Sequence, residues 1–260
     1  MTDVPINTGN APLGVGKIIG DTFSLFFGRF ASVAILGIVP AILLVLLQYV
    51  IAPGTDFSDP AALSGTEFSI GRQVIGTVLN IVGSALVTAL IIRFAYDAKI
   101  GNPIQINSYF SSALKSLVPI VICSIIVGLA TGIAAIALII PGLYVYAMWS
   151  VVTPSIVIED AGFGALGRSF ELTRNYRWPV LGTIMLMWIC AIIPMAIIGG
   201  ILGAAGAASN IGLTTIILGI NAVATGLVMA FFGIGVALIY ARLREIKEGT
   251  SVEQLAEVFA

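Results

Sequence analysis

Six long stretches of the chain contain only uncharged and mostly apolar residues, and the charged residues all fall outside them. These stretches are close to the ~20 residues that an α-helix needs to cross the ~30 Å hydrocarbon core of a membrane. The pattern therefore predicts an all-α polytopic membrane protein with six transmembrane helices. Their approximate bounds are Ala31–Ile51, Val74–Ile92, Leu117–Ile140, Gly142–Ile158, Val180–Ile201 and Thr215–Leu238.

Three amphipathic segments precede the first, third and fifth of these spans. They are Lys17–Phe30, Gln105–Leu117 and Phe163–Trp178, and in each the apolar residues recur at helical spacing. Such segments form helices that lie in the headgroup plane of the membrane. We therefore predict three hairpins of transmembrane helices, each preceded by an amphipathic interfacial helix, with the pair Pro141-Gly142 as the turn of the second hairpin.

The three units form a single membrane domain that covers residues 1–260. Residues 1–16 are an N-terminal tail, residues 17–240 contain the three helix-hairpin units, and residues 241–260 are a cytoplasmic tail. In this last tail, Ser251 and Gln254 predict a capping box and hence a short helix. The N-terminal residues lack the basic and apolar regions of a cleavable signal peptide, so we expect none.

Composition supports the membrane prediction and excludes several kinds of chemistry. Only 10% of the residues are charged and 58% are hydrophobic, whereas a soluble domain has about 25% charged residues. The chain contains no His, which excludes His-based catalytic triads and HExxH zinc sites. Its net charge of −1 gives no basic field for nucleic acid. We therefore expect no cofactor, no metal, no nucleic-acid partner and no enzymatic activity.

The positive charges lie on one side of the predicted membrane domain. With six spans, every Lys and Arg except Arg72 falls at the side that also carries both termini. Loops rich in Lys and Arg stay in the cytoplasm, so we expect both termini and the basic loops to be cytoplasmic. Arg72 and the acids Asp56, Asp59 and Glu67 then face outward.

Six of the cytoplasmic cations lie on or beside the amphipathic segments, where each is attracted to anionic lipid by about 1 kcal/mol. These candidate lipid contacts are Lys17, Arg29, Lys115, Arg168, Arg174 and Arg177. The first hypothesis is a non-catalytic membrane protein that organises lipid or partner proteins at the cytoplasmic face. Membrane lipids are the expected partners, with other membrane proteins or further copies of the chain as alternatives. The amphipathic helices equally fit a role that only caps the bundle and fixes its tilt.

A polar seam between the second and sixth spans gives the alternative function, a transporter or channel for a neutral or lipid-like solute. Its members recur at helical spacing on each span. They are Arg72, Asn80, Ser84 and Thr88 on the second span, and Asn221 and Thr225 on the sixth. Polar and small side chains commonly join helices in membranes, so simple packing is the favoured interpretation of the seam.

Small residues at four-residue spacing allow two helix backbones to approach closely. Two spans carry such ladders: Ser124, Gly128 and Gly132 in the third, and Ala222, Gly226 and Ala230 in the sixth. The sequence does not tell whether these ladders meet helices of the same chain or of another copy.

Two adjacent carboxylates, Glu159 and Asp160, follow the fourth span. Neighbouring residues point apart on a helix, so their spacing does not suit an acid–base pair. We predict instead that Asp160 is the N-cap of the third amphipathic helix.

The central run Ile140–Gly182 is similar to the pattern of the glycerophosphoryl diester phosphodiesterase membrane-domain family and its YciC-type relatives. The residues that carry this resemblance are Pro141, Gly142, Pro154, Glu159, Arg168, Ser169 and Trp178. The ending Tyr240–Gly249 is similar to that of the family as well. The resemblance implies a six-helix domain of the bacterial inner membrane. Some relatives carry a soluble phosphodiesterase domain, which these residues do not contain, so the resemblance implies no catalytic activity.

Overall fold

The computed structural model describes residues 12–51, 70–206 and 211–249. These residues form helices joined by short turns, with no strand among them. Six helical stretches are long and apolar enough to cross a membrane, which confirms the predicted all-α class and the six spans. The predicted C-terminal helix and most of the N-terminal tail lie outside the described residues.

The first three helices follow the predicted pattern closely. Helix α1 (Val15–Gly28) is the first amphipathic helix, and its apolar face buries Ile18 and Phe26. Helix α2 (Phe30–Ile51) begins after a break at Arg29 and contains Pro40. Helix α4 (Ile70–Ile100) continues eight residues beyond the predicted end of the second span, so charged residues of the following loop belong to this helix.

The second amphipathic segment is not a separate helix. It forms the first turns of α5 (Ile106–Ala137), because the sequence offers no glycine or helix-breaking turn within it, and α5 continues through Pro119. Helix α5 ends at Leu138, which is extended, and α6 (Ile139–Met148) follows at once. The turn therefore lies before Pro141, which occupies the first turn of α6, where a missing N–H costs nothing.

Gly142 has a packing role in place of the predicted turn. A Cβ atom on Gly142 would lie 2.7 Å from the Cβ of Ala135, so its lack of a side chain lets α6 pack back against the end of α5. The fourth predicted span is also divided, because α7 (Val152–Glu159) follows α6 after a short interruption.

The last part of the chain contains the third amphipathic segment and two long helices. A 3-10 turn, η1 (Gly162–Gly164), and α8 (Ala165–Thr173) precede α9 (Arg177–Gly206) and α10 (Ile211–Glu248). The prediction for Asp160 is wrong. Asp160 ends α7 in a left-handed conformation with φ of 53°, and the N-cap of α8 is Gly164.

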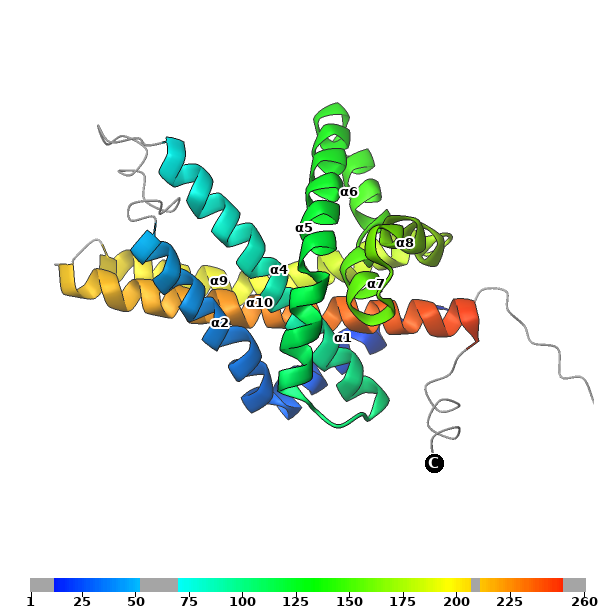
Figure 1. Ribbon diagram of the computed structural model, residues 1–260, viewed down its shortest axis with the longest axis horizontal. Coiled ribbons are helices and arrows are strands. Elements are labelled where there is room, and N and C mark those ends of the chain that lie inside the picture. Colours follow the sequence, from blue (N-terminus) through cyan, green and yellow to red (C-terminus); the bar gives the residue numbers. More distant parts are fainter. Residues whose placement is uncertain (1–11, 52–69, 207–210, 250–260) are drawn as a thin grey trace, which may run out of the picture.

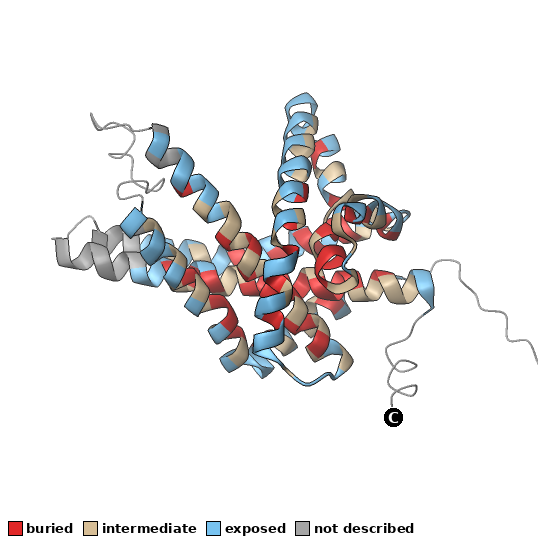
Figure 2. Ribbon diagram, in the orientation of Figure 1, coloured by how far each residue is buried: buried red, intermediate tan, exposed pale blue. Residues whose placement is uncertain are grey.

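The core lies where the helices cross, and the remaining parts of the spans extend outward from it. In Figure 1, α9 and α10 run side by side along the long axis, and α5 and α6 extend together away from α2 and α4. Buried positions concentrate at the crossing, and exposed positions line the outer parts of the helices (Figure 2). The exposed positions are largely apolar, as expected of surface that faces lipid.

The small-residue ladder of the sixth span meets a helix of the same chain. A Cβ atom on Gly226 of α10 would lie 2.8 Å from the carbonyl oxygen of Gly37 on α2, and 3.1 Å from the Cβ of Ala41. The ladder of the third span differs, because nothing lies within 4 Å of a Cβ placed on Gly128 or Gly132. The ladder of the sixth span thus joins α10 to α2, and the ladder of the third span is exposed on α5.

Candidate functional site

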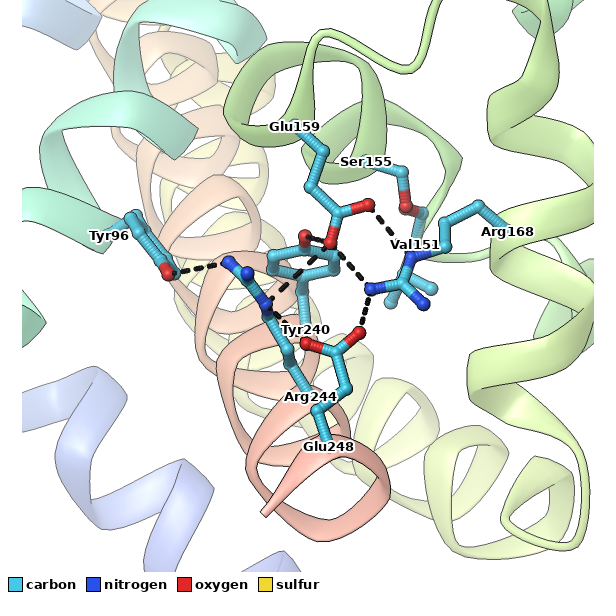
Figure 3. Close-up of polar contacts among 8 residues, drawn as sticks. All are labelled: Tyr96, Val151, Ser155, Glu159, Arg168, Tyr240, Arg244 and Glu248. Atoms are coloured by element: carbon cyan, nitrogen blue, oxygen red, sulfur yellow. Dashed lines mark hydrogen bonds and ion pairs between the residues drawn. The ribbon is translucent and has the colours of Figure 1, made fainter. Parts of the chain in front are cut away.

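Helices from distant parts of the chain meet in a network of charged and tyrosine side chains (Figure 3). Helix α10 contributes Tyr240, Arg244 and Glu248, which share one face because they are four residues apart. Glu159 is the last residue of α7, and Arg168 lies in α8. The resemblance noted in the sequence had singled out Glu159, Arg168 and the run Tyr240–Gly249, but it did not show that these residues contact one another.

Glu159 is the centre of this network. The Nε of Arg168 donates to its Oε2 at 2.8 Å and the Nη2 to its Oε1 at 2.7 Å. The hydroxyl of Tyr240 donates to the same Oε1. Arg168 also contacts Glu248, which accepts a 2.7 Å hydrogen bond from the Nε of Arg244. Two carboxylates therefore balance two guanidiniums, and the network ties α7 and α8 to α10.

Two further features define the electrostatics of this network. Arg244 donates to the hydroxyl of Tyr96 at 3.2 Å, which adds α4 to the joined helices. The hydrogen bonds with Glu159, more than any other contact, hold the pKa of Arg168 above its ordinary value, so this residue stays a cation. Arg168 thus forms ion pairs with two carboxylates of the protein, although the sequence suggested it as a lipid contact.

Helix α8 is held from its other side by hydroxyl groups. Ser169 and Thr173 donate to the carbonyl oxygen of Met148, at 2.9 Å and 3.0 Å respectively. Met148 is the last residue of α6, and the final carbonyls of a helix lack partners within it. These bonds therefore join the end of α6 to α8.

A second polar group lies at the end of α4. Asp97 is only 7% exposed and accepts from the Nδ2 of Asn102 at 3.3 Å, while Arg93 lies 3.6 Å from its carboxylate. Arg93 also donates to the carbonyl oxygen of Val157 on α7. The sequence prediction missed Asp97 because it ended the second span at Ile92.

The side chains of four of the six predicted lipid contacts form neither an ion pair nor a hydrogen bond within the described part of the chain. They are Lys17, Arg29, Lys115 and Arg174, and all four are exposed. They belong to three separate segments, namely α1 with the break after it, the first turns of α5, and the connection between α8 and α9. Most of the other Lys and Arg at this end of the described chain are paired with carboxylates, so these four carry much of the positive charge that no carboxylate balances.

The sixth predicted lipid contact, Arg177, lines a cavity of about 500 Å³. The guanidinium of Arg177 lies 4.6 Å from the ring centre of Phe170 and 5.0 Å from that of Tyr144, and it donates to the Tyr144 hydroxyl at 2.8 Å. Its Nε is buried and has no hydrogen-bond partner among the described residues. The other lining residues are Arg174, Asn175 and Trp178.

The α4 side of the predicted polar seam is only partly inside the protein. The side chain of Arg72 lies outside the described part, and Asn80 is exposed. Ser84 and Thr88 are half-buried, and the hydroxyl of Ser84 donates to the carbonyl of Ile81 in its own helix.

The α10 side of the seam is exposed. Thr225 donates to Asn221 at 3.4 Å, and among the described residues no hydrogen bond joins this pair to the polar side chains of α4. The two helices instead meet at an apolar contact, where a Cβ on Gly233 would lie 2.7 Å from the Cγ2 of Ile91. A solute path along this seam stays a prediction.

The described side chains of the site do not by themselves identify a ligand or a reaction. The described residues include no group of three Cys, Asp or Glu side chains placed to hold a metal ion. The chain matches no family model, no curated protein and no solved structure. What the structure shows is a helical protein with six apolar helices that suit a membrane, and with a fixed polar network where the helices cross.

Proposed function

We propose that this chain is a non-catalytic integral protein of the bacterial inner membrane that organises anionic lipid at its cytoplasmic face. The observation that carries the proposal is the set of four exposed cations without a partner, Lys17, Arg29, Lys115 and Arg174. Cations in this setting gain about 1 kcal/mol each near an anionic leaflet.

Large apolar side chains beside these cations favour lipid over a soluble protein as the partner. Phe27 and Phe30 flank Arg29, and Phe110 and Leu114 precede Lys115, all of them exposed. A cation next to exposed aromatic and aliphatic groups is typical of a helix at headgroup depth, where the ring enters the acyl region and the charge meets phosphate.

The orientation and location rest on the sequence. The Lys and Arg distribution supports a cytoplasmic position for both termini, and the resemblance to the glycerophosphoryl diester phosphodiesterase membrane-domain family supports the bacterial inner membrane. Within the network, Glu159 and Glu248 are engaged by arginines, which makes these two carboxylates poor candidates for a general base.

Native lipid analysis tests the proposal. The full chain is extracted from membranes in polymer-bounded discs, and the anionic fraction of the lipid in the discs is compared with that of the whole membrane. We expect enrichment of anionic lipid around the wild type. A triple variant, Lys17→Gln, Arg29→Gln and Lys115→Gln, is expected to lose most of it, since each charge is worth about fivefold in local lipid preference.

The matched control keeps the charge and changes only the side chain. The variant Lys17→Arg, Arg29→Lys and Lys115→Arg should retain the wild-type enrichment. The proposal fails if the glutamine variant and the wild type carry lipid of the same composition.

A further inference from the structure

We infer that the cavity between α6, α8 and α9 is a specific binding site for the phosphate group of an anionic phospholipid. Its lining residues are Tyr144, Phe170, Arg174, Asn175, Arg177 and Trp178. The inference rests on the proposed function. It adds one site that recognises a particular lipid headgroup to a protein surface that otherwise attracts anionic lipid by charge alone.

The lining of the cavity is suited to an anion. It contains two arginines, one amide and three aromatic rings, and no carboxylate. Guanidinium groups bind phosphate oxygens through paired hydrogen bonds that are both strong and directional. A phosphate in this cavity would meet two cations whose charge is not neutralised by any of the lining side chains.

Arg177 is fixed in position without being neutralised. Phe170 and Tyr144 hold its guanidinium through ring contacts, and Tyr144 accepts one of its hydrogen bonds. These partners are uncharged, in contrast to the carboxylates that bind Arg168. Its buried Nε still lacks an acceptor among the described residues, and a buried donor without a partner is costly.

The backbone brings the second arginine to the same place. Helix α8 ends at Thr173, and Asn175 adopts a left-handed conformation with φ of 71° that turns the chain before α9 begins. Asn is one of the few residues that tolerate this conformation. Arg174 and Arg177 thus line one cavity although α8 and α9 are separate helices.

The surroundings favour a lipid over a soluble phosphate as the source. Trp178 is 62% exposed, as expected of an aromatic side chain at the membrane interface. Farther along α9, Ile189, Ile192 and Ile193 are exposed and form an apolar surface on which an acyl chain can lie. The cavity volume also exceeds the needs of a bare phosphate ion and falls within the range of small-molecule sites.

Fluorescence titration of Trp178 tests this site. The full chain is purified in a neutral detergent with Trp149→Phe and Trp188→Phe, which leaves Trp178 as the only tryptophan. The probes are dioctanoyl phosphatidylglycerol, dioctanoyl phosphatidylcholine and glycerol 3-phosphate. We expect a saturable change with phosphatidylglycerol, at a concentration at least about tenfold lower than with either other probe. Native mass spectrometry of the chain with all three tryptophans gives a second measure of bound phosphatidylglycerol.

Two glutamine variants separate this site from general surface charge. Arg174→Gln should weaken phosphatidylglycerol binding by about tenfold or more. Because Arg174 is exposed, this substitution should not disturb folding, so a loss of binding would not be explained by misfolding. Lys99→Gln removes the same charge from another exposed position, one that is not among the proposed lipid contacts, and should leave this binding unchanged. Equal weakening by both variants would overturn the site while leaving the proposed function intact. Equal binding of phosphatidylcholine would overturn anion recognition, and equal binding of glycerol 3-phosphate would overturn lipid as the source.

Discussion

Replacement of Glu159 by Gln tests whether the network in Figure 3 holds the helices together. Gln keeps the size of the side chain but removes its charge and turns one acceptor into an N–H donor. In the structure, both oxygens of Glu159 accept from Arg168, and Oε1 also accepts from Tyr240. The variant therefore places a donor against a guanidinium and leaves Glu248 as the only carboxylate that contacts Arg168.

The expected loss of stability follows from the partial burial of the pair. The side chain of Glu159 is 18% exposed and that of Arg168 is 26% exposed. Breaking a fully buried pair costs about 3–5 kcal/mol, whereas an exposed pair contributes about 0–1 kcal/mol. An intermediate cost of about 2 kcal/mol corresponds to a decrease of about 4–8 °C in Tm for a chain of this size.

The measurement is the fraction of the chain that remains folded after heating in detergent, followed by size-exclusion chromatography. A matched control is Asp21→Asn, which removes the 2.8 Å ion pair between Asp21 and Lys99, whose side chains are each 35% exposed. This exposed pair should cost less than about 1 kcal/mol. If Glu159→Gln and Asp21→Asn unfold at the same temperature, the network does not stabilise the fold as we reason.

Two further predictions concern packing and orientation. Gly226→Ala should lower stability by about 1–3 kcal/mol in the same heating assay, since its Cβ would lie 2.8 Å from the carbonyl oxygen of Gly37. Gly128→Ala should not lower it, because its Cβ meets nothing within 4 Å. With both native cysteines replaced by Ala, Asp59→Cys should react with an impermeant maleimide on intact spheroplasts, whereas Lys115→Cys should react only after lysis. The reverse pattern would contradict the proposed cytoplasmic position of the basic loops.

The spans could be predicted from the sequence, but the contacts between them could not. A run without charge is a local property, so the apolar runs predicted six spanning helices that the structure confirms. The network depends on residues far apart in the chain, since Glu159 and Tyr240 are 81 positions apart, and periodicity holds no information about such pairs.

Local breaks were also difficult to place from the sequence. The chain turns at Leu138, three residues before the expected Pro141, because proline is well tolerated in the first turn of a helix and so can follow a turn as readily as form one. Asp160 was expected to cap α8, yet it ends α7 in a left-handed conformation that Asp tolerates.

Helix α8 connects the network to the cavity. It has only nine residues, and a helix that short is not stable in isolation, so its position depends on its contacts. Arg168 holds it to α7 and α10, Ser169 and Thr173 hold it to α6, and Phe170 on the same helix lines the cavity. Because Arg174 follows directly at its end, a shift of α8 would move Arg174 relative to Arg177. Glu159→Gln, although outside the cavity lining, is therefore expected to weaken phosphatidylglycerol binding in the Trp178 titration, and Asp21→Asn is not. Unchanged binding in Glu159→Gln would show that the turn at Asn175 alone positions the two arginines.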